Sequence, residues 1–132
     1  MTRPRPRLDD LTRPFWTGGA KGLLLIQHCP SCDGWTHPPL PLCRHCGRED
    51  HGFAAVPGTG TVDSFTVNHQ PWLPGMEVPF IIARVAIDGA PGVYLTTNIV
   101  GCEEADLAAG DRVRVTFEEQ GDIHFPLFEK AK

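Results

Sequence analysis

Apolar and polar residues alternate with a period of two through much of the second half of the chain. Between residues 81 and 87 every second side chain is apolar, and Arg84 lies on the opposite face. Residues 112–117 repeat the pattern, with Val113, Val115 and Phe117 directed inward. Because such alternation is typical of a strand that buries one face, both segments are predicted to be strands of one sheet.

Three further segments have the composition of strands and are separated by turn residues. The predicted strands are Thr61 to Asn68, Val93 to Val100 and Ile123 to Phe128. Turns are expected at 88–92 and 121–122, one helical turn at 103–107, and a bend or bulge at Gly58 to Gly60. Five strands in about 75 residues, with one short helical insertion, best match the five-stranded oligonucleotide/oligosaccharide-binding (OB) barrel.

The first half of the chain lacks this period and divides into shorter segments. Residues 1–13 carry four arginines among prolines and are predicted to form a flexible basic arm. Phe15-Trp16 marks a short helical segment, Leu23 to His28 a strand, and residues 35–42 a connection that prolines constrain. The predicted organisation is the arm at 1–13, a helical segment with a cysteine-rich module at 14–52, and the barrel at 53–132.

Four of the five cysteines form two close pairs, Cys29-Pro-Ser-Cys32 and Cys43-Arg-His-Cys46. Each pair suits a knuckle, and two knuckles complete a tetrahedron of thiolates around one ion at about 2.3 Å per Zn–S bond. Two disulfides would need an oxidising compartment, and an iron-containing electron carrier would use the same ligands. The predicted cofactor is a structural zinc ion held by Cys29, Cys32, Cys43 and Cys46.

A catalytic zinc ion keeps an open coordination position, whereas four thiolates close the shell. A ribbon of about 25 residues cannot bury a core alone, so its fold is expected to depend on the ion. Gly34 and Gly47 lie where the backbone of a knuckle needs open geometry. The lone Cys102 is predicted to be a packing residue. Three histidines near the cysteines are predicted to be surface or supporting residues rather than ligands: His28, His37 and His45.

The composition excludes several classes of protein. Twelve Lys and Arg against 16 Asp and Glu give a net charge of −4, which disfavours a general nucleic-acid surface. No apolar run approaches the roughly 18 to 20 residues of a membrane span, and the residues before Leu23 do not resemble a signal peptide. Fourteen glycines and 13 prolines, with little helical periodicity, argue against a helical bundle. A cytoplasmic protein with no membrane partner is expected.

Several short motifs follow one another in order between about residues 14 and 128. They are Phe15-Trp16, Leu23-Leu24, the two cysteine pairs, Pro38-Pro39, Gly58-Thr59-Gly60-Thr61-Val62, Ser64-Phe65-Thr66-Val67 and Phe125-Pro126-Leu127-Phe128. Together they resemble the zinc-ribbon plus OB-fold proteins associated with acyl-CoA metabolism. The resemblance implies a mostly β protein in which a short N-terminal helical segment precedes a rubredoxin-like zinc ribbon and then the OB-fold barrel.

Members of that family work as small subunits or fused domains beside thiolase-fold enzymes. These enzymes include acyl-CoA thiolases, hydroxymethylglutaryl-CoA synthase assemblies and lipid-transfer-protein-like aldolases that shorten steroid side chains. The resemblance implies a non-catalytic accessory subunit that pairs with such an aldolase or thiolase in steroid, fatty acyl or aromatic acyl-CoA degradation and helps to form the acyl-CoA site. Some relatives carry a hydratase domain that this sequence lacks, so a stand-alone subunit or an excised domain is expected.

The chemistry of coenzyme A suggests which residues would contact it. Its phosphates favour Arg and Lys donors, and its adenine and pantetheine favour apolar and aromatic walls. The predicted CoA-binding residues are Arg13, Phe15, Trp16, Lys21, Arg44 and Arg48. Large aromatic residues are enriched at the centres of protein interfaces. The predicted partner-interface residues are Trp35, Trp72 and Phe80.

Two other functions stay open at this point. Zinc ribbons and OB folds also bind single-stranded nucleic acid, although residues 101–129 hold eight acidic and two basic side chains. An independent acyl-CoA enzyme would need a nucleophile or a base, and the sequence has neither a Ser-His-Asp signature nor a phosphate-binding glycine motif. His69 is the one candidate for acid–base work. No catalytic residue is predicted.

Overall fold

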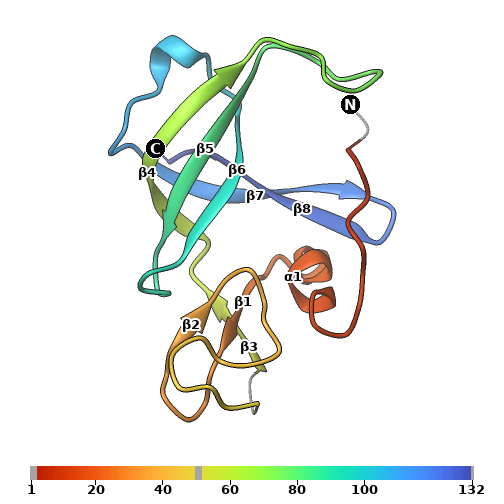
Figure 1. The fold of residues 1–132 in the computed structure, drawn as a ribbon. Coiled ribbons are helices and arrows are strands. Elements are labelled where there is room, and N and C mark those ends of the chain that lie inside the picture. Colours follow the sequence, from red (N-terminus) through yellow and green to blue (C-terminus); the bar gives the residue numbers. More distant parts are fainter. Residues whose placement is uncertain (1–2, 50–51, 132) are drawn as a thin grey trace.

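The structure is a computed structural model, which describes residues 3–49 and 52–131 of the chain. A small sheet and a larger one lie end to end, with the helical segment α1 beside the junction between them (Figure 1). The helical segments are α1 (Arg13–Thr17), η1 (Gly18–Lys21) and η2 (Glu104–Asp106). The strands are β1 (Leu24–His28), β2 (Trp35–Thr36), β3 (Gly52–Val56), β4 (Thr59–Asn68), β5 (Phe80–Ile87), β6 (Tyr94–Val100), β7 (Arg112–Gln120) and β8 (Ile123–Lys130).

Five strands close into a barrel in the order β4-β5-β6-β8-β7. Four of the five pairings are antiparallel, and β6 lies parallel to β8 where Ile99 faces Phe128. The barrel closes because β7 pairs with the first residues of β4, so that Thr59 faces Arg114. The predicted five-stranded barrel is confirmed, with β6 and β8 paired only at Ile99–Phe128 and Val100–Glu129.

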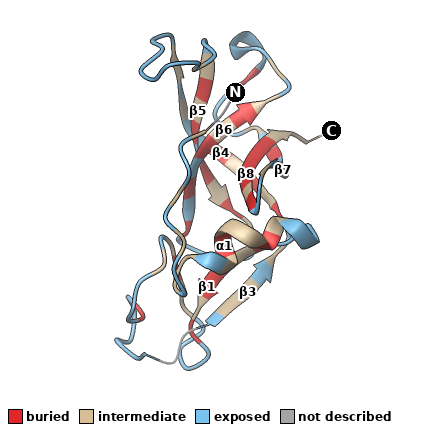
Figure 2. Ribbon diagram, turned by 90° about the vertical axis from the view of Figure 1, so that its right-hand side faces the viewer, coloured by how far each residue is buried: buried red, intermediate tan, exposed pale blue. Residues whose placement is uncertain are grey.

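The barrel core follows the alternation seen in the sequence. In β5 the residues Ile81, Ala83, Val85 and Ile87 are all buried, and Arg84 is exposed. Figure 2 shows the same striping along the barrel strands, where buried and exposed segments follow each other. Burial of one medium-sized apolar side chain stabilises a fold by about 1.5 to 3 kcal/mol. The inward residues of β5 are therefore a main source of the barrel's stability.

A bend or bulge is predicted at Gly58 to Gly60; the structure has a turn at Gly58, and the bulge lies further along β4. The register of β4 against β5 shifts between Val62 and Ser64, so that Asp63 is the extra residue. The two glycines serve other purposes. Gly58 has a φ of +82°, and a Cβ at Gly60 would lie 2.5 Å from the carbonyl oxygen of Ala86. The glycines thus make the turn and the close approach to β5.

The small sheet has the order β2-β1-β3 and belongs to the cysteine-rich module. All five residues of β3 pair with β1, from Gly52 opposite His28 to Val56 opposite Leu24. Through this pairing, β3 extends the small sheet to Val56, whereas the predicted end of the cysteine-rich module is residue 52. Gln27 is buried in β1, and its side-chain amide both donates to and accepts from the backbone of Leu40, at 2.7 and 2.8 Å. The proline-rich connection is thereby held against the sheet.

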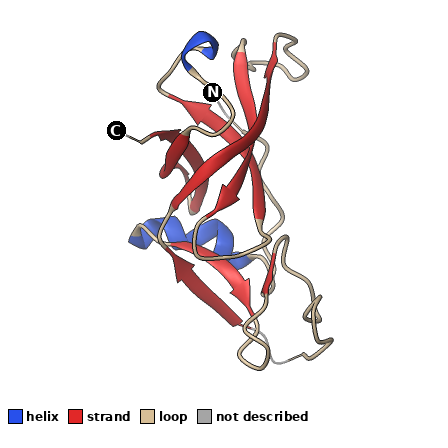
Figure 3. Cartoon of the chain, turned by 90° about the vertical axis from the view of Figure 1, so that its left-hand side faces the viewer, coloured by secondary structure: helices blue, strands red, loops and turns tan. Residues whose placement is uncertain are grey.

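The α1–η1 segment packs between the small sheet and the β7–β8 hairpin (Figure 3). Phe15 is buried, and the ring of Trp16 meets the ring of Phe125 edge to face, with centroids 5.7 Å apart. A Cβ at Gly19 would lie 2.5 Å from atoms of both Phe117 and His124, so only glycine allows this approach. Within the described part of the chain, no helix is long and apolar enough to cross a membrane.

The arm that precedes α1 follows the surface of the barrel from residue 3 onward (Figure 1). The guanidinium of Arg3 donates to Glu118 at 3.1 Å and to Asn98 at 2.7 Å, and it lies 5.7 Å from the ring centroid of Phe125. Leu8 packs against the cluster of apolar residues on β8. Residues 3–12 therefore have defined contacts with the barrel, which the sequence pattern did not predict.

Candidate metal centre and junction cavity

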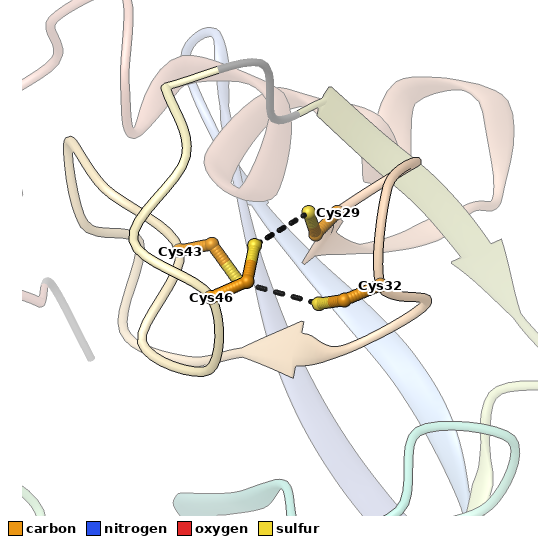
Figure 4. Close-up of side chains that lie close together, drawn as sticks. All are labelled: Cys29, Cys32, Cys43 and Cys46. Carbon is orange, nitrogen blue, oxygen red and sulfur yellow. Dashed lines mark hydrogen bonds between the residues drawn. The ribbon is translucent and has the colours of Figure 1, made fainter.

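The four paired cysteines meet at the far end of the small sheet (Figure 4). Their sulfur atoms all lie within 4.8 Å of one another, and two contacts, Cys29 to Cys46 and Cys32 to Cys43, measure 3.6 Å. A tetrahedron with Zn–S bonds of about 2.3 Å has sulfur atoms about 3.8 Å apart. The cluster therefore has the size and the ligand type of a tetrahedral zinc site.

The two knuckles share one backbone pattern. In the first, the N–H of Asp33 donates to the carbonyl of Cys29, and in the second, the N–H of Gly47 donates to the carbonyl of Cys43. Asp33 and Gly47 both have positive φ, at +60° and +77°. Gly47 is the left-handed residue of the second knuckle. Gly34 has a different role, because a Cβ at Gly34 would clash with the ring of His45. Both glycines are thus required, but for different reasons.

The thiols of the cluster cannot all ionise without a cation. Backbone N–H groups of Cys46 and His45 lower the pKa of Cys43 to about 6. At Cys32 the N–H of Gly34 favours the thiolate, but burial and the neighbouring sulfurs outweigh it and raise the pKa to about 12. A bound divalent cation removes this conflict, because it deprotonates coordinating thiols outright. The donor set therefore fits a zinc ion, which would supply charge and rigidity here.

The three flanking histidines have other partners. His28 Nε2 lies 3.2 Å from a carboxylate oxygen of Asp33, and His45 Nε2 lies 3.1 Å from the carbonyl oxygen of Trp35. His37 packs its ring against Phe15, with centroids 4.8 Å apart. Among the described residues, the four cysteines are the one group of His, Cys, Asp and Glu side chains placed to hold a metal.

The side chain of Arg44 connects the metal centre to the barrel. Arg44 lies between two zinc ligands in sequence, and its Nε donates to the carbonyl of Trp35 at 3.0 Å. Its Nη2 donates across to the carbonyl of Gly92, in the β5–β6 turn, at 3.3 Å. Arg44 therefore links the second knuckle to both the small sheet and the barrel.

A cavity of about 390 Å³ lies where the helix, the proline-rich connection and the barrel meet. We call it the junction cavity. Its lining comes from four parts of the chain: the arm and α1, the connection, β6 and β8. Apolar residues dominate the walls, chiefly Phe15, Trp16, Leu95, Phe125 and Leu127. Three of the sequence motifs contribute to the lining: Phe15-Trp16, Pro38-Pro39 and Phe125-Pro126-Leu127. The sequence does not show that they meet, because they lie far apart along the chain.

His37 is the polar residue of the lining with an unmet hydrogen-bonding atom. Its Nδ1 is buried and has no hydrogen-bond partner within the described ranges. Burial also lowers the pKa of His37 to about 4, because a charged ring would lose its hydration. The side chain is therefore neutral at pH 7 and adds no charge to the junction cavity.

Two of the six predicted CoA-binding residues belong to the lining of the junction cavity. Phe15 and Trp16 line the junction cavity, whereas none of the four basic residues belongs to its described lining. Arg13, Lys21 and Arg48 are exposed, and Arg44 is held by backbone carbonyls. The aromatic pair thus lines the junction cavity, and the four cations lie outside its described lining.

The three predicted interface residues also differ in their surroundings. Trp72 is 72% exposed in the β4–β5 loop, where its Nε1 donates to Asn68 at 2.9 Å. Trp35 is half-buried and stacks near His28, with ring centroids 4.5 Å apart. Phe80 is half-buried at the start of β5. Trp72 is accordingly the one of the three that is largely open to a partner.

Two family models match successive parts of the chain and meet within the β3 strand. The rubredoxin-like zinc ribbon domain of ChsH2 matches residues 16–52, and the C-terminal OB-fold domain of ChsH2 matches residues 54–118. The chain belongs to the ChsH2 family of zinc-ribbon and OB-fold proteins. The four cysteines are accordingly the structural zinc site of a ChsH2-type ribbon. The barrel continues beyond the matched segment, through β8.

Two curated relatives are 36% identical to the chain. One is the "Probable enoyl-CoA hydratase alpha subunit" of Thermomonospora curvata, aligned over 131 residues, which are 98% of this chain and 40% of that protein. The other is the "3-oxo-4,17-pregnadiene-20-carboxyl-CoA hydratase alpha subunit" of Mycobacterium tuberculosis, aligned over 96% of this chain and 37% of that protein. The chain thus spans about two fifths of the length of these relatives.

Two solved structures have the same fold. A chain of the structure titled "Ltp2-ChsH2(DUF35) aldolase" is 34% identical, with a TM-score of 0.83, and the match covers 97% of this chain and 100% of that one. A protein of unknown function from the DUF35 family of Sulfolobus solfataricus has a TM-score of 0.62 at 17% identity, over 89% and 82% of the two chains. The second match shows the fold alone.

Proposed function

We propose that this chain is a non-catalytic accessory subunit that pairs with a thiolase-fold acyl-CoA enzyme and helps to form its acyl-CoA site. One observation carries the proposal: the match to the ChsH2(DUF35) aldolase structure extends over nearly the whole chain and all of the matched chain. The titles of the relatives name acyl-CoA hydratase subunits and an aldolase. The degradation of steroid, fatty acyl or aromatic acyl-CoA thioesters in the cytoplasm is the setting we propose.

The coordination chemistry favours a structural rather than a catalytic role for the zinc ion. Four thiolates fill a tetrahedral shell and leave no position at which zinc could polarise a substrate carbonyl. The carbon–carbon bond of the thioester would then be cleaved by residues of the partner. We favour an aldolase over a thiolase as that partner, because the matched structure is that of an Ltp2-ChsH2(DUF35) aldolase.

The β4–β5 loop is the surface that we propose for docking. Trp72, Leu73 and Val78 lie close together in sequence there and are 72%, 45% and 37% exposed. Large apolar side chains in one exposed loop mark an interface more often than they mark an ordinary surface. The hydrogen bond from Trp72 to Asn68 fixes the indole, so less side-chain entropy would be lost on docking. Phe80 and Trp35 would then contribute at most indirectly.

The phosphates of coenzyme A would be bound by exposed cations. Arg13, Lys21 and Arg48 have exposed side chains and remain available, in contrast to Arg44. Trp16 and Phe15 would contact apolar parts of the thioester from the junction cavity. We propose that the partner enzyme completes this site, since the chain alone does not gather the cations around the aromatic pair.

Co-expression with a thiolase-fold partner followed by size-exclusion chromatography tests the proposal. The two proteins should elute together, and Trp72→Ser should weaken the complex by about tenfold or more. Tyr94→Ser is the matched control, because Tyr94 is 40% exposed at the opposite end of the β5–β6 pair. Separate elution of the unaltered chain, with the activity of the partner unchanged, would refute the proposal.

A further inference from the structure

The junction cavity is a partly open hollow between the ribbon module and the barrel. Its volume of about 390 Å³ falls in the range of about 300 to 1,000 Å³ typical of small-molecule sites. An apolar cavity of about 150 Å³ is sufficient to bind benzene. The junction cavity could therefore hold a group of about two to three rings, or a chain of similar bulk.

Two polar side chains of the lining, Thr97 and Asn98, are already bonded within the protein, and Nδ1 of His37 is the one buried polar lining atom in the described ranges without a partner. The hydroxyl of Thr97 donates to the carbonyl of Pro126 at 2.8 Å. The amide of Asn98 donates to the carbonyl of Ile81 at 2.9 Å and accepts from Arg3 at 2.7 Å. These bonds leave little capacity for a strongly polar guest.

The charge of the lining is also balanced. Arg3 is the one cationic side chain in the described lining, and its guanidinium faces the carboxylate of Glu118 at 3.1 Å. No Asp or Glu belongs to the lining within residues 3–49 and 52–131. A charged guest would give up its hydration without gaining an unpaired counter-ion. An uncharged, apolar guest meets aromatic and aliphatic walls instead.

We propose that the junction cavity is a binding site for an uncharged, largely apolar group of about two to three rings in size. The identity of that group rests on the proposed function, under which it is the acyl part of the thioester. The site combines Phe15 and Trp16 from the helix with Leu95, Phe125 and Leu127 from the barrel. It therefore exists only when the ribbon module and the barrel are packed together.

The volume favours a small molecule over a side chain inserted by a partner protein. A single aromatic ring fills a cavity of about 150 Å³, which is less than half of the space present. Filling the remainder would require several side chains from one partner segment. A fused-ring or branched aliphatic group fills it as one unit.

Titration with N-phenyl-1-naphthylamine tests the proposal directly. This dye is uncharged, and its fluorescence rises in apolar surroundings. The zinc-loaded chain should bind it with one saturable site, and Thr96→Trp should weaken binding by about tenfold, because Thr96 is an exposed residue on the cavity wall. Thr66→Trp is the matched control, since Thr66 is exposed on β4 and does not belong to the lining. Equal affinity in all three proteins would overturn the proposal.

Methyl NMR spectra of the unaltered chain provide a second readout that does not depend on the folding of a variant. The dye should shift the methyl signals of Leu95 and Leu127 and leave those of Leu73 and Leu42, which lie on exposed surfaces. Shifts confined to Leu73 or Leu42 would show surface binding and refute the cavity. The experiment needs no partner, so a failed complex with a thiolase-fold enzyme would leave this result standing. Displacement of the dye by octanoyl-CoA, but not by free coenzyme A, is expected if the group is the acyl part.

Discussion

The zinc ligands act as individual residues whose loss has a large effect. A structural zinc site contributes about 10 to 16 kcal/mol of apparent binding free energy in small zinc-dependent folds. Cys29→Ser or Cys43→Ser should therefore reduce the bound zinc from about one ion per chain to near zero and unfold the ribbon. Zinc content by atomic emission, together with near-ultraviolet circular dichroism as a measure of aromatic packing, would check this. Cys102→Ser is the control, because Cys102 lies outside the cluster; full zinc content in Cys29→Ser would contradict the assignment.

His37 gives the fold a pH dependence of known sign. Its pKa is about 4 in the folded chain and about 6.5 when exposed, so the unfolded state binds more protons between these values. The free energy of unfolding should therefore fall as the pH drops below about 6.5, by about 1 kcal/mol between pH 7 and about 5.5. Below a pH of about 4 this contribution changes no further.

Denaturation at several pH values would isolate the contribution of this histidine. His37→Phe should flatten the pH dependence, since a phenyl ring suits the contact with Phe15 and carries no proton. His69→Phe provides the matched control in an exposed loop. Zinc retention must be followed at each pH, because acid also protonates the thiolates. An identical slope in His37→Phe and in the unaltered chain would contradict the assignment to His37.

At the scale of elements, the barrel strands were predictable because each buries one face. The period of two in β5 and β7 identifies strands without knowledge of their partners. The sequence does not identify β3 as a strand, because Gly52, Ala54 and Ala55 give no alternation of apolar and polar side chains. Its pairing with β1 depends on backbone hydrogen bonds rather than on side-chain pattern. Sequence alone therefore placed Phe53 in the barrel module.

The arm and the junction cavity could not be predicted for a related reason. Arg3 bonds to residues 95 and 115 positions further along the chain, and nothing local marks those partners. The cavity is likewise formed by separate segments that meet only in the folded chain. The four zinc ligands, in contrast, carry their own spacing and were identified directly.

The connection that Arg44 makes between the ribbon and the barrel can be tested by substitution. Its hydrogen bonds to Trp35 and Gly92 link the ribbon to the barrel, and each such bond contributes about 0.5 to 1.5 kcal/mol. Arg44→Ala should lower the melting temperature by about 3 to 5 °C, and Arg48→Ala, an exposed neighbour, by much less. Differential scanning calorimetry measures both. Equal melting temperatures for the two variants would show that Arg44 does not link the modules.

On the scale of the whole molecule, the zinc ribbon, the helix and the barrel form one packed unit. The ion fixes the knuckles, the second knuckle holds Arg44, and Arg44 reaches the barrel turn. The same packing forms the walls of the junction cavity and leaves the β4–β5 loop exposed at the other end of the barrel (Figure 1). This arrangement suits a protein that presents a stable surface to an enzyme.

Reconstitution of thioester cleavage from purified components tests the central claim most directly. The partner enzyme alone, the zinc-loaded chain alone and the two together would be assayed with one β-hydroxyacyl-CoA substrate. We expect no turnover by the chain, and an increase of about tenfold or more in the kcat/KM of the partner when the chain is added. Turnover by the chain alone, or a partner whose kcat/KM is the same with and without it, would contradict the account.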